Sequence, residues 1–155
     1  MVVHQLITLK NVDILLEENK TLVRKFFEKA NRDRGTPVEM CTKDFTAHIT
    51  GKSPLDLQAF ERYQTNYYAS FSDTETVIED LIAEGDRVAF RGVVRTVHTA
   101  EFMGVPATGK QIVVSIIGFV KIVHGKIAEW WNSPDRLSWM QQIDALPEFG
   151  KPAKN

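Results

Sequence analysis

The sequence has little of what marks secreted or metal-binding proteins. Its 155 residues include one cysteine, Cys41, so no intramolecular disulfide can form and no cluster of thiols can bind a metal. The lone thiol favours a reducing compartment, and we expect a cytoplasmic protein. The four histidines show no metal-ligand spacing, so no metal site is predicted.

Neither charge nor apolar sequence is concentrated in one part of the chain. The 19 lysines and arginines are scattered among 20 aspartates and glutamates, and the formal net charge is -1, whereas nucleic-acid binding needs a basic face. No run approaches the roughly 18 apolar residues that cross a bilayer. Residues 1–10 also lack the small-residue cleavage site of a signal peptide. We therefore expect no nucleic-acid partner and no membrane partner.

Two stretches of the chain have helical spacing before any long strand begins. From Leu15 to Ala30 apolar residues recur every three or four positions, which predicts an amphipathic helix from residue 12 until near residues 34–35. We expect Gly35 to end it in the left-handed conformation, with Pro37 preventing its continuation. A short helix over 37–41, a small strand over 45–49 and a second amphipathic helix over 56–71 should follow.

The second half of the chain changes to strand spacing. Residues 76–83, 87–98, 111–123 and 126–132 are rich in β-branched and aromatic residues. The turns at 84–86 and 124–125 are short enough for antiparallel hairpins, while the longer connection over 99–110 leaves open whether it closes over a pocket. A last helix over 137–145 and a frayed tail over 148–155 complete the prediction. This order predicts a single α+β domain over residues 1–155, with a core over 14–147 and flexible ends.

Five short motifs occur in one order: ENKxLVRxFF (18–27), DFxxH (44–48), VxxDLIAEGDRV (77–88), HTxEFxGVPxTGK (98–110) and GKIxExWxxxD (125–135). Together they closely resemble the SnoaL-like polyketide cyclase or ester cyclase family. The resemblance implies the cone-shaped fold of nuclear transport factor 2, ketosteroid isomerases and scytalone dehydratase, in which helices pack on the concave face of a curved antiparallel sheet. It also implies a homodimer or higher homo-oligomer, and no metal or organic cofactor.

The resemblance also locates the family's acid/base groups. In the antibiotic cyclases of the family, an aspartate on the last strand closes a ring by proton transfer, assisted by a histidine on the preceding strand. Aligned on residues 125–127 and 134–135, these positions hold Asn132 and Gly118. Because an amide does not exchange a proton near neutral pH, the family's base is missing from this chain.

Strand alternation sorts the side chains around position 132. Trp130 and Asn132 should share one face of the last strand, and Ile127 and Trp131 the other. We expect Asn132 to face the pocket as a hydrogen-bonding group, and Trp130 either to line the pocket or to fill the core. Trp131 and Ile127 should lie on the outer face, where an oligomer interface is expected.

If the protein is an enzyme, Asp135 and His48 are the candidate bases. Asp135 matches the family's second acidic position, although a helix N-cap is the competing role for it. His48 ends the small strand, although a lone histidine is more often structural. The candidate substrate contacts are Tyr63, Tyr67, His98, Ile116, Gly118, Trp130 and Asn132.

The sequence leaves two main functions open. The first is a cofactor-free cyclase, isomerase or dehydratase that acts by proton transfer on a small, hydrophobic, oxygenated molecule. The second is a non-catalytic binding or carrier domain that has kept the pocket and lost the base, as Asn132 and Gly118 favour. An interaction module that uses the outer sheet face is a third, which rests on fold analogy alone.

Overall fold

The computed structural model describes residues 2–147 and residue 150, with side chains from residue 10 onward. In chain order the elements are α1 (Val2–Asp33), a 3₁₀ helix (Val38–Met40), β1 (Cys41–Ile49), β2 (Leu55–Asp56), α2 (Leu57–Ser70), β3 (Phe71–Glu84), β4 (Arg87–His98), β5 (Gln111–Val123), β6 (Lys126–Pro134) and α3 (Arg136–Gln142).

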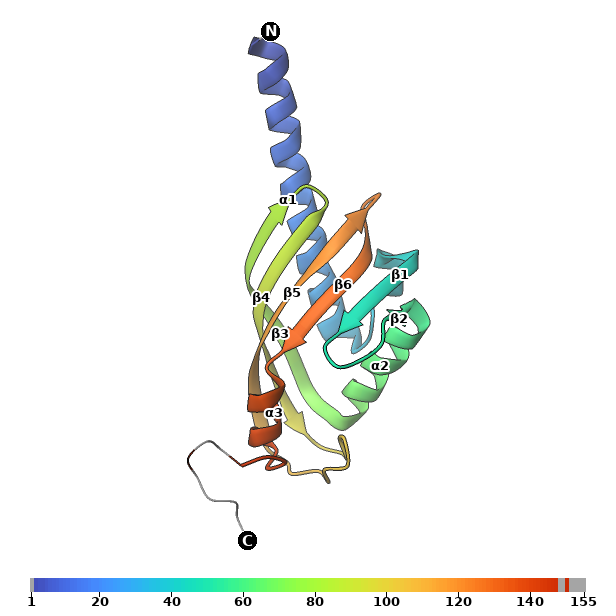
Figure 1. Ribbon diagram of the computed structural model, residues 1–155, viewed down its shortest axis with the longest axis vertical. Helices are drawn as coiled ribbons and strands as arrows, with labels where there is room; N and C mark the ends of the chain where they lie inside the picture. Colours follow the sequence, from blue (N-terminus) through green and yellow to red (C-terminus); the bar gives the residue numbers. More distant parts are fainter. Residues whose placement is uncertain (1, 148–149, 151–155) are drawn as a thin grey trace.

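The strands form one open, six-stranded sheet on which α1, α2 and α3 pack (Figure 1). The strand order is β2-β1-β6-β5-β4-β3, and the predicted antiparallel pairing of the four long strands is confirmed. β1 lies parallel to β6, which makes the sheet mixed. β1 and β6 are separated in the chain by α2 and four other strands. No hairpin turn joins them directly, so their pairing need not be antiparallel.

The hairpins lie where the sequence predicts them. β4 and β5 begin and end at the predicted residues, and β6 runs two residues further than predicted, to Pro134. Between β5 and β6, His124 and Gly125 form a two-residue turn with φ of 49° and 70°. Positive φ at both turn positions matches the natural twist of a hairpin.

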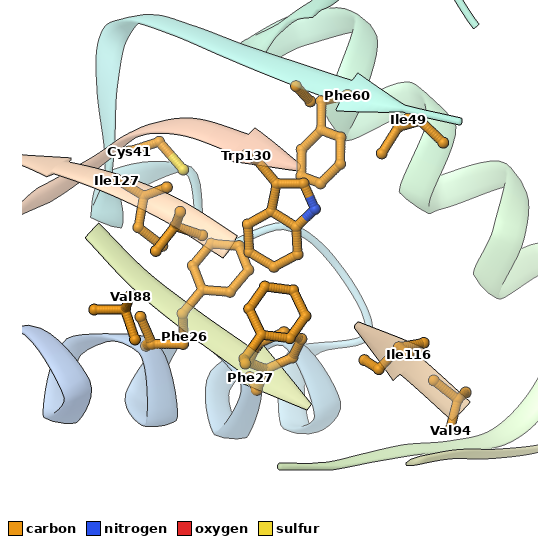
Figure 2. Close-up of a cluster of buried hydrophobic side chains, with 14 of the residues drawn as sticks. Phe26, Phe27, Cys41, Ile49, Phe60, Val88, Val94, Ile116, Ile127 and Trp130 are labelled. Carbon is orange, nitrogen blue, oxygen red and sulfur yellow. The ribbon is translucent and has the colours of Figure 1, made fainter. Parts of the chain in front are cut away.

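The helices cover the face of the sheet that carries the apolar side chains. On β4, Val88 and Phe90 are buried whereas Arg87 and Arg91 are exposed, which is the alternation expected of a strand with one covered face. The C-terminal half of α1 lays Phe26 against this inner face (Figure 2). The core therefore lies between α1, α2 and the inner face of the sheet.

The end of α1 differs from the prediction. The helix starts at Val2 and its first turns extend beyond the sheet (Figure 1). Its left-handed terminal residue is Arg34, with φ of 51°, so the predicted Gly35 cap is wrong. The Arg34 guanidinium donates to the carbonyl oxygens of Tyr68 and Phe71, both at 3.0 Å, and these bonds hold Arg34 in the turn.

Two further boundaries shift by a few residues. β3 already starts at Phe71, which was predicted to end the preceding helix, and α3 ends at Gln142, before the predicted residue 145. The predicted frayed tail over 148–155 lies outside the described residues except for Gly150. Among the described residues, no helix, α1 included, combines the length and the apolar character needed to cross a bilayer.

Candidate functional site

A small cavity, called here the inner cavity, lies between the helices and the inner face of the sheet. Its volume is about 80 Å³, enough for a few water molecules. The structure brings five of the predicted substrate contacts to its wall: Tyr63, Tyr67, Ile116, Trp130 and Asn132. None of the described side chains that line this cavity is charged.

A larger cavity, called here the mouth cavity, adjoins the inner cavity between α2, α3 and the connection over residues 99–110. Its volume of about 390 Å³ lies within the usual range for small-molecule sites. The two cavities share the side chains of Tyr63, Tyr67, Pro134 and Trp139. A ligand in the mouth cavity would therefore contact the same tyrosines and indole that border the inner cavity.

Trp130 is both a core residue and part of the inner-cavity wall. Its side chain is 2% exposed, and its ring packs on Phe26, Phe27, Phe60 and Phe90 at centroid distances of 5.2, 5.5, 5.8 and 5.4 Å. In Figure 2 the indole nitrogen points away from Phe26 and Phe27. The aromatic packing fixes the indole ring, and its Nε1 atom is buried.

Four buried polar atoms around the inner cavity have no hydrogen-bond partner among the described residues. They are the Nε1 atoms of Trp130 and Trp139, the Oδ1 atom of Asn132 and the hydroxyl oxygen of Tyr67. An unsatisfied buried polar group typically costs about 1–3 kcal/mol. The inner cavity can therefore bind a molecule that forms hydrogen bonds through oxygen atoms, either ordered water or part of a ligand.

Two tyrosines one helical turn apart on α2 line both cavities. Burial raises the pKa of the Tyr63 phenol, and the positive charge of Arg136 nearby opposes this shift. Burial also raises the pKa of Tyr67, and the neighbouring Thr96 and Thr74 hydroxyls oppose it. Both phenols are therefore protonated near neutral pH and can donate hydrogen bonds to a ligand.

Gly118 lies on the inner face and pairs with Asn132, but the space that a side chain at position 118 would occupy is filled by Phe90. A Cβ atom at position 118 would lie 2.2 Å from the carbonyl oxygen of Trp131 and 2.4 Å from Cζ of Phe90. The Phe90 ring occupies the place of a side chain at this position. A histidine, which the resemblance to the cyclases would put here, does not fit without moving the sheet.

His48 lies on the outer face of the sheet, away from both cavities. Its ring stacks on Trp131 at a centroid distance of 4.8 Å and an angle of 9°, and its Nε2 atom is 4.0 Å from a Glu129 carboxylate oxygen. Its neighbours Ala47 and Ile49 are buried on the inner face. Strand alternation thus separates His48 from Asn132, and the structure does not bring the predicted base to the pocket.

Asp135 and His98 also lie outside the two cavities. Asp135 is exposed and caps α3, because its carboxylate accepts a hydrogen bond from the Ser138 backbone N–H at 3.0 Å. This is the competing role expected from the sequence. His98 is fully buried, with its Nδ1 3.1 Å from the Thr108 hydroxyl and its ring stacked on Phe71.

The outer face of β6 differs from the prediction at Ile127. The register shifts between Lys121 and Ile122, so Ile127 pairs with Ile122 and lies fully buried in the core. The prediction that Ile127 is on the outer face is therefore wrong, since the irregularity breaks the simple alternation. Trp131 does lie outside and stacks on Phe119 at 4.5 Å. The homo-oligomer stays a prediction.

The structure adds three charged residues to the mouth cavity that the sequence did not single out. They are Lys52, Glu101 and Arg136. Glu101 falls within the HTxEFxGVPxTGK motif, which is the sequence signal that could have pointed to it. Phe102 and Met103 of the same segment also line the mouth cavity, so this connection forms part of its wall. No group of metal-binding side chains comes together in the described part of the chain.

The fold, with cavities between the helices and the inner face of the sheet, is that of a SnoaL-like protein. The family model for the SnoaL-like polyketide cyclases matches residues 21–143, and the chain belongs to this family. No curated protein matches the chain significantly.

Solved structures agree with this fold. AclR, a proposed hydroxylase from Streptomyces galilaeus, has a TM-score of 0.78 and 24% identity, with 85% of this chain and 99% of that chain covered. IdmH, a proposed polyketide cyclase from Streptomyces antibioticus, has a TM-score of 0.71 and 25% identity, with 81% and 97% covered. A SnoaL-like protein from Jannaschia sp. CCS1 has a TM-score of 0.75 and 20% identity, with 84% and 94% covered.

Proposed function

We propose that this protein binds a small, oxygenated, largely apolar molecule that occupies the mouth cavity and places an oxygen-bearing end at the adjoining inner cavity, without the family's acid/base chemistry at position 132. The supporting observation is the set of unpartnered polar atoms around the inner cavity, whose described lining residues carry no charge; these atoms belong to Tyr67, Trp130, Asn132 and Trp139. Two indole N–H groups fit ligand oxygen acceptors, and the Asn132 amide can accept or donate. Such a wall recognises an oxygenated molecule but supplies no base.

The binding proposal is tested by native mass spectrometry of protein purified from its own cells. We expect a small molecule bound at one per chain, and we expect its occupancy to fall in Trp139→Phe and Asn132→Leu. Trp139→Phe removes the indole N–H group from the wall, and Asn132→Leu replaces the amide group by an apolar side chain of similar size. Thr65→Val, on the exposed side of α2, is the matched control. A protein that carries no small molecule and shows no change in tryptophan fluorescence with any oxygenated aromatic compound would contradict the proposal.

A second candidate function is proton transfer by Glu101. Its support is that Glu101 is the one carboxylate among the described residues that line the mouth cavity, where Tyr63 can donate a hydrogen bond. Glu101 would remove a proton from a carbon next to a ligand carbonyl, and Tyr63 would stabilise the enolate. NMR of the co-purified ligand in deuterated water tests this. Exchange by the wild type that disappears in Glu101→Gln supports an enzyme, whereas the absence of exchange leaves the binding function.

A further inference from the structure

The mouth cavity contains two positive charges that come from separate parts of the chain. Lys52 belongs to the turn between β1 and β2, and Arg136 is the first residue of α3. The Arg136 guanidinium lies against this turn, since a Cβ atom at Gly51 would be 3.7 Å from its Nη1. The fold therefore brings two like charges to one side of a small-molecule cavity.

Both cations contact the same tyrosine. The Lys52 ammonium lies over the Tyr63 ring, 5.4 Å from its centroid. Arg136 is close enough to the Tyr63 hydroxyl for its charge to lower the pKa of that phenol against the effect of burial. Tyr63 thus holds two cationic groups at one end of the mouth cavity, with its own hydroxyl beside them.

Neither cation forms an ion pair with any of the described carboxylates. Glu101 lines the same cavity, and it too forms no ion pair with either of them. Other charged side chains on helices and strands do form ion pairs, as Lys29 does with Asp33 and Arg91 with Glu79. Two neighbouring cations with one unpaired carboxylate leave a net positive charge in the cavity lining, which favours a singly charged anion.

We propose that Lys52 and Arg136 bind a carboxylate group of the ligand, whose apolar body extends toward Trp139 and Tyr67. This inference rests on the proposed binding function and specifies its ligand class: a small aromatic or otherwise apolar carboxylic acid. Arg136 supplies the planar donor pair that suits a carboxylate, and Lys52 adds a point charge. Trp139 and Tyr67 provide an aromatic part of the same cavity lining, with rings 5.4 Å apart.

Naphthoate and naphthamide test the inference because they have the same shape and differ in charge. Binding is followed by tryptophan fluorescence and calorimetry for the wild type, Lys52→Gln, Arg136→Gln and the double variant. We expect the wild type to bind naphthoate about tenfold more tightly than naphthamide, the effect of partly screened charge-assisted contacts. The preference should shrink in each single variant and vanish in the double variant, while naphthamide affinity stays constant and so reports intact folding.

Arg62→Gln is the matched control, since Arg62 is an exposed cation on α2 that lies outside both cavities. It changes the net charge by the same amount and should keep the full preference for naphthoate. Equal binding of both probes by the wild type would overturn the carboxylate inference and leave the binding function standing. A preference that survives in the double variant would also overturn it. If neither probe binds, the carboxylate inference falls, while the binding function is decided by the native mass spectrometry described above.

Discussion

Asn132→Asp introduces a carboxylate where the resemblance to the antibiotic cyclases predicts one, and it measures how this site changes the pKa of an acid. The Oδ1 atom of Asn132 is buried, and position 132 pairs with Gly118 on one side and Ile49 on the other. No charged side chain is among the described residues of the inner-cavity wall, so no cation compensates for the loss of solvent. The indole N–H groups of Trp130 and Trp139 can donate to the carboxylate, and this opposes the effect of burial.

The net effect should be a raised pKa for the introduced carboxyl group. Burial raises the pKa of a fully buried acid by as much as about 3–5 units, while hydrogen bonds from neutral donors offset only part of this. For this half-buried position we take a net rise of about 2 units above the unfolded value of about 3.9. Below the unfolded pKa both states are protonated, and the substitution carries no charge penalty. The penalty then grows as the pH rises toward the folded pKa and is constant above it, at about 2.7 kcal/mol.

Urea unfolding followed by tryptophan fluorescence tests this pH dependence. Relative to the wild type, the variant should lose about 1 kcal/mol at about pH 4.5 and about 2.7 kcal/mol at about pH 7.5. Ser133→Asp is the control, since Ser133 is the exposed neighbour on the same strand. It should show no such pH dependence. An equal loss for Asn132→Asp at both pH values would mean that the carboxylate is solvated, and would refute the low-dielectric inner cavity.

Two further substitutions test the packing around this site. Gly118→Ala should lose about 2–4 kcal/mol of unfolding free energy in urea, because the new methyl group meets the Trp131 carbonyl oxygen and the Phe90 ring; a loss below about 0.5 kcal/mol would contradict the geometry. Asp135→Ala should lose about 1 kcal/mol by removing the bond to the Ser138 N–H, while Asp135→Asn keeps the cap and the stability; equal losses in the two variants would show that the charge, and not the cap, is what matters.

The fold was predictable wherever one face of a helix or strand is buried along its whole length. β4 alternates exposed Arg87 and Arg91 with buried Val88 and Phe90, and such alternation fixes both the limits and the orientation of a strand. The prediction failed where a distant contact decides the local structure. Arg34 takes the left-handed position that Gly35 would take more easily, because two carbonyl groups from residues 68 and 71 bind its side chain.

The candidate site was predictable for residues on regular elements and not for residues brought together by the fold. Tyr63 and Tyr67 follow from helical spacing, and Trp130 and Asn132 from strand alternation, and all four line the inner cavity. Lys52 could not be predicted as a neighbour of residue 136, because a surface turn and a helix start more than 80 residues apart have no shared pattern.

The replacements at positions 118 and 132 are best understood as one change in packing. Gly118 and Asn132 face each other across β5 and β6, and the space above Gly118 is filled by Phe90 from β4. Phe90 in turn packs on Trp130 and Phe27, so the volume that a histidine would need belongs to the aromatic core. A histidine at position 118 would therefore need a smaller residue at position 90 and also a shift of the β6 backbone, because a Cβ atom there would lie 2.2 Å from the Trp131 carbonyl oxygen. Because packing of this kind stabilises the fold whether or not a ligand is bound, the aromatic core itself favours glycine at position 118.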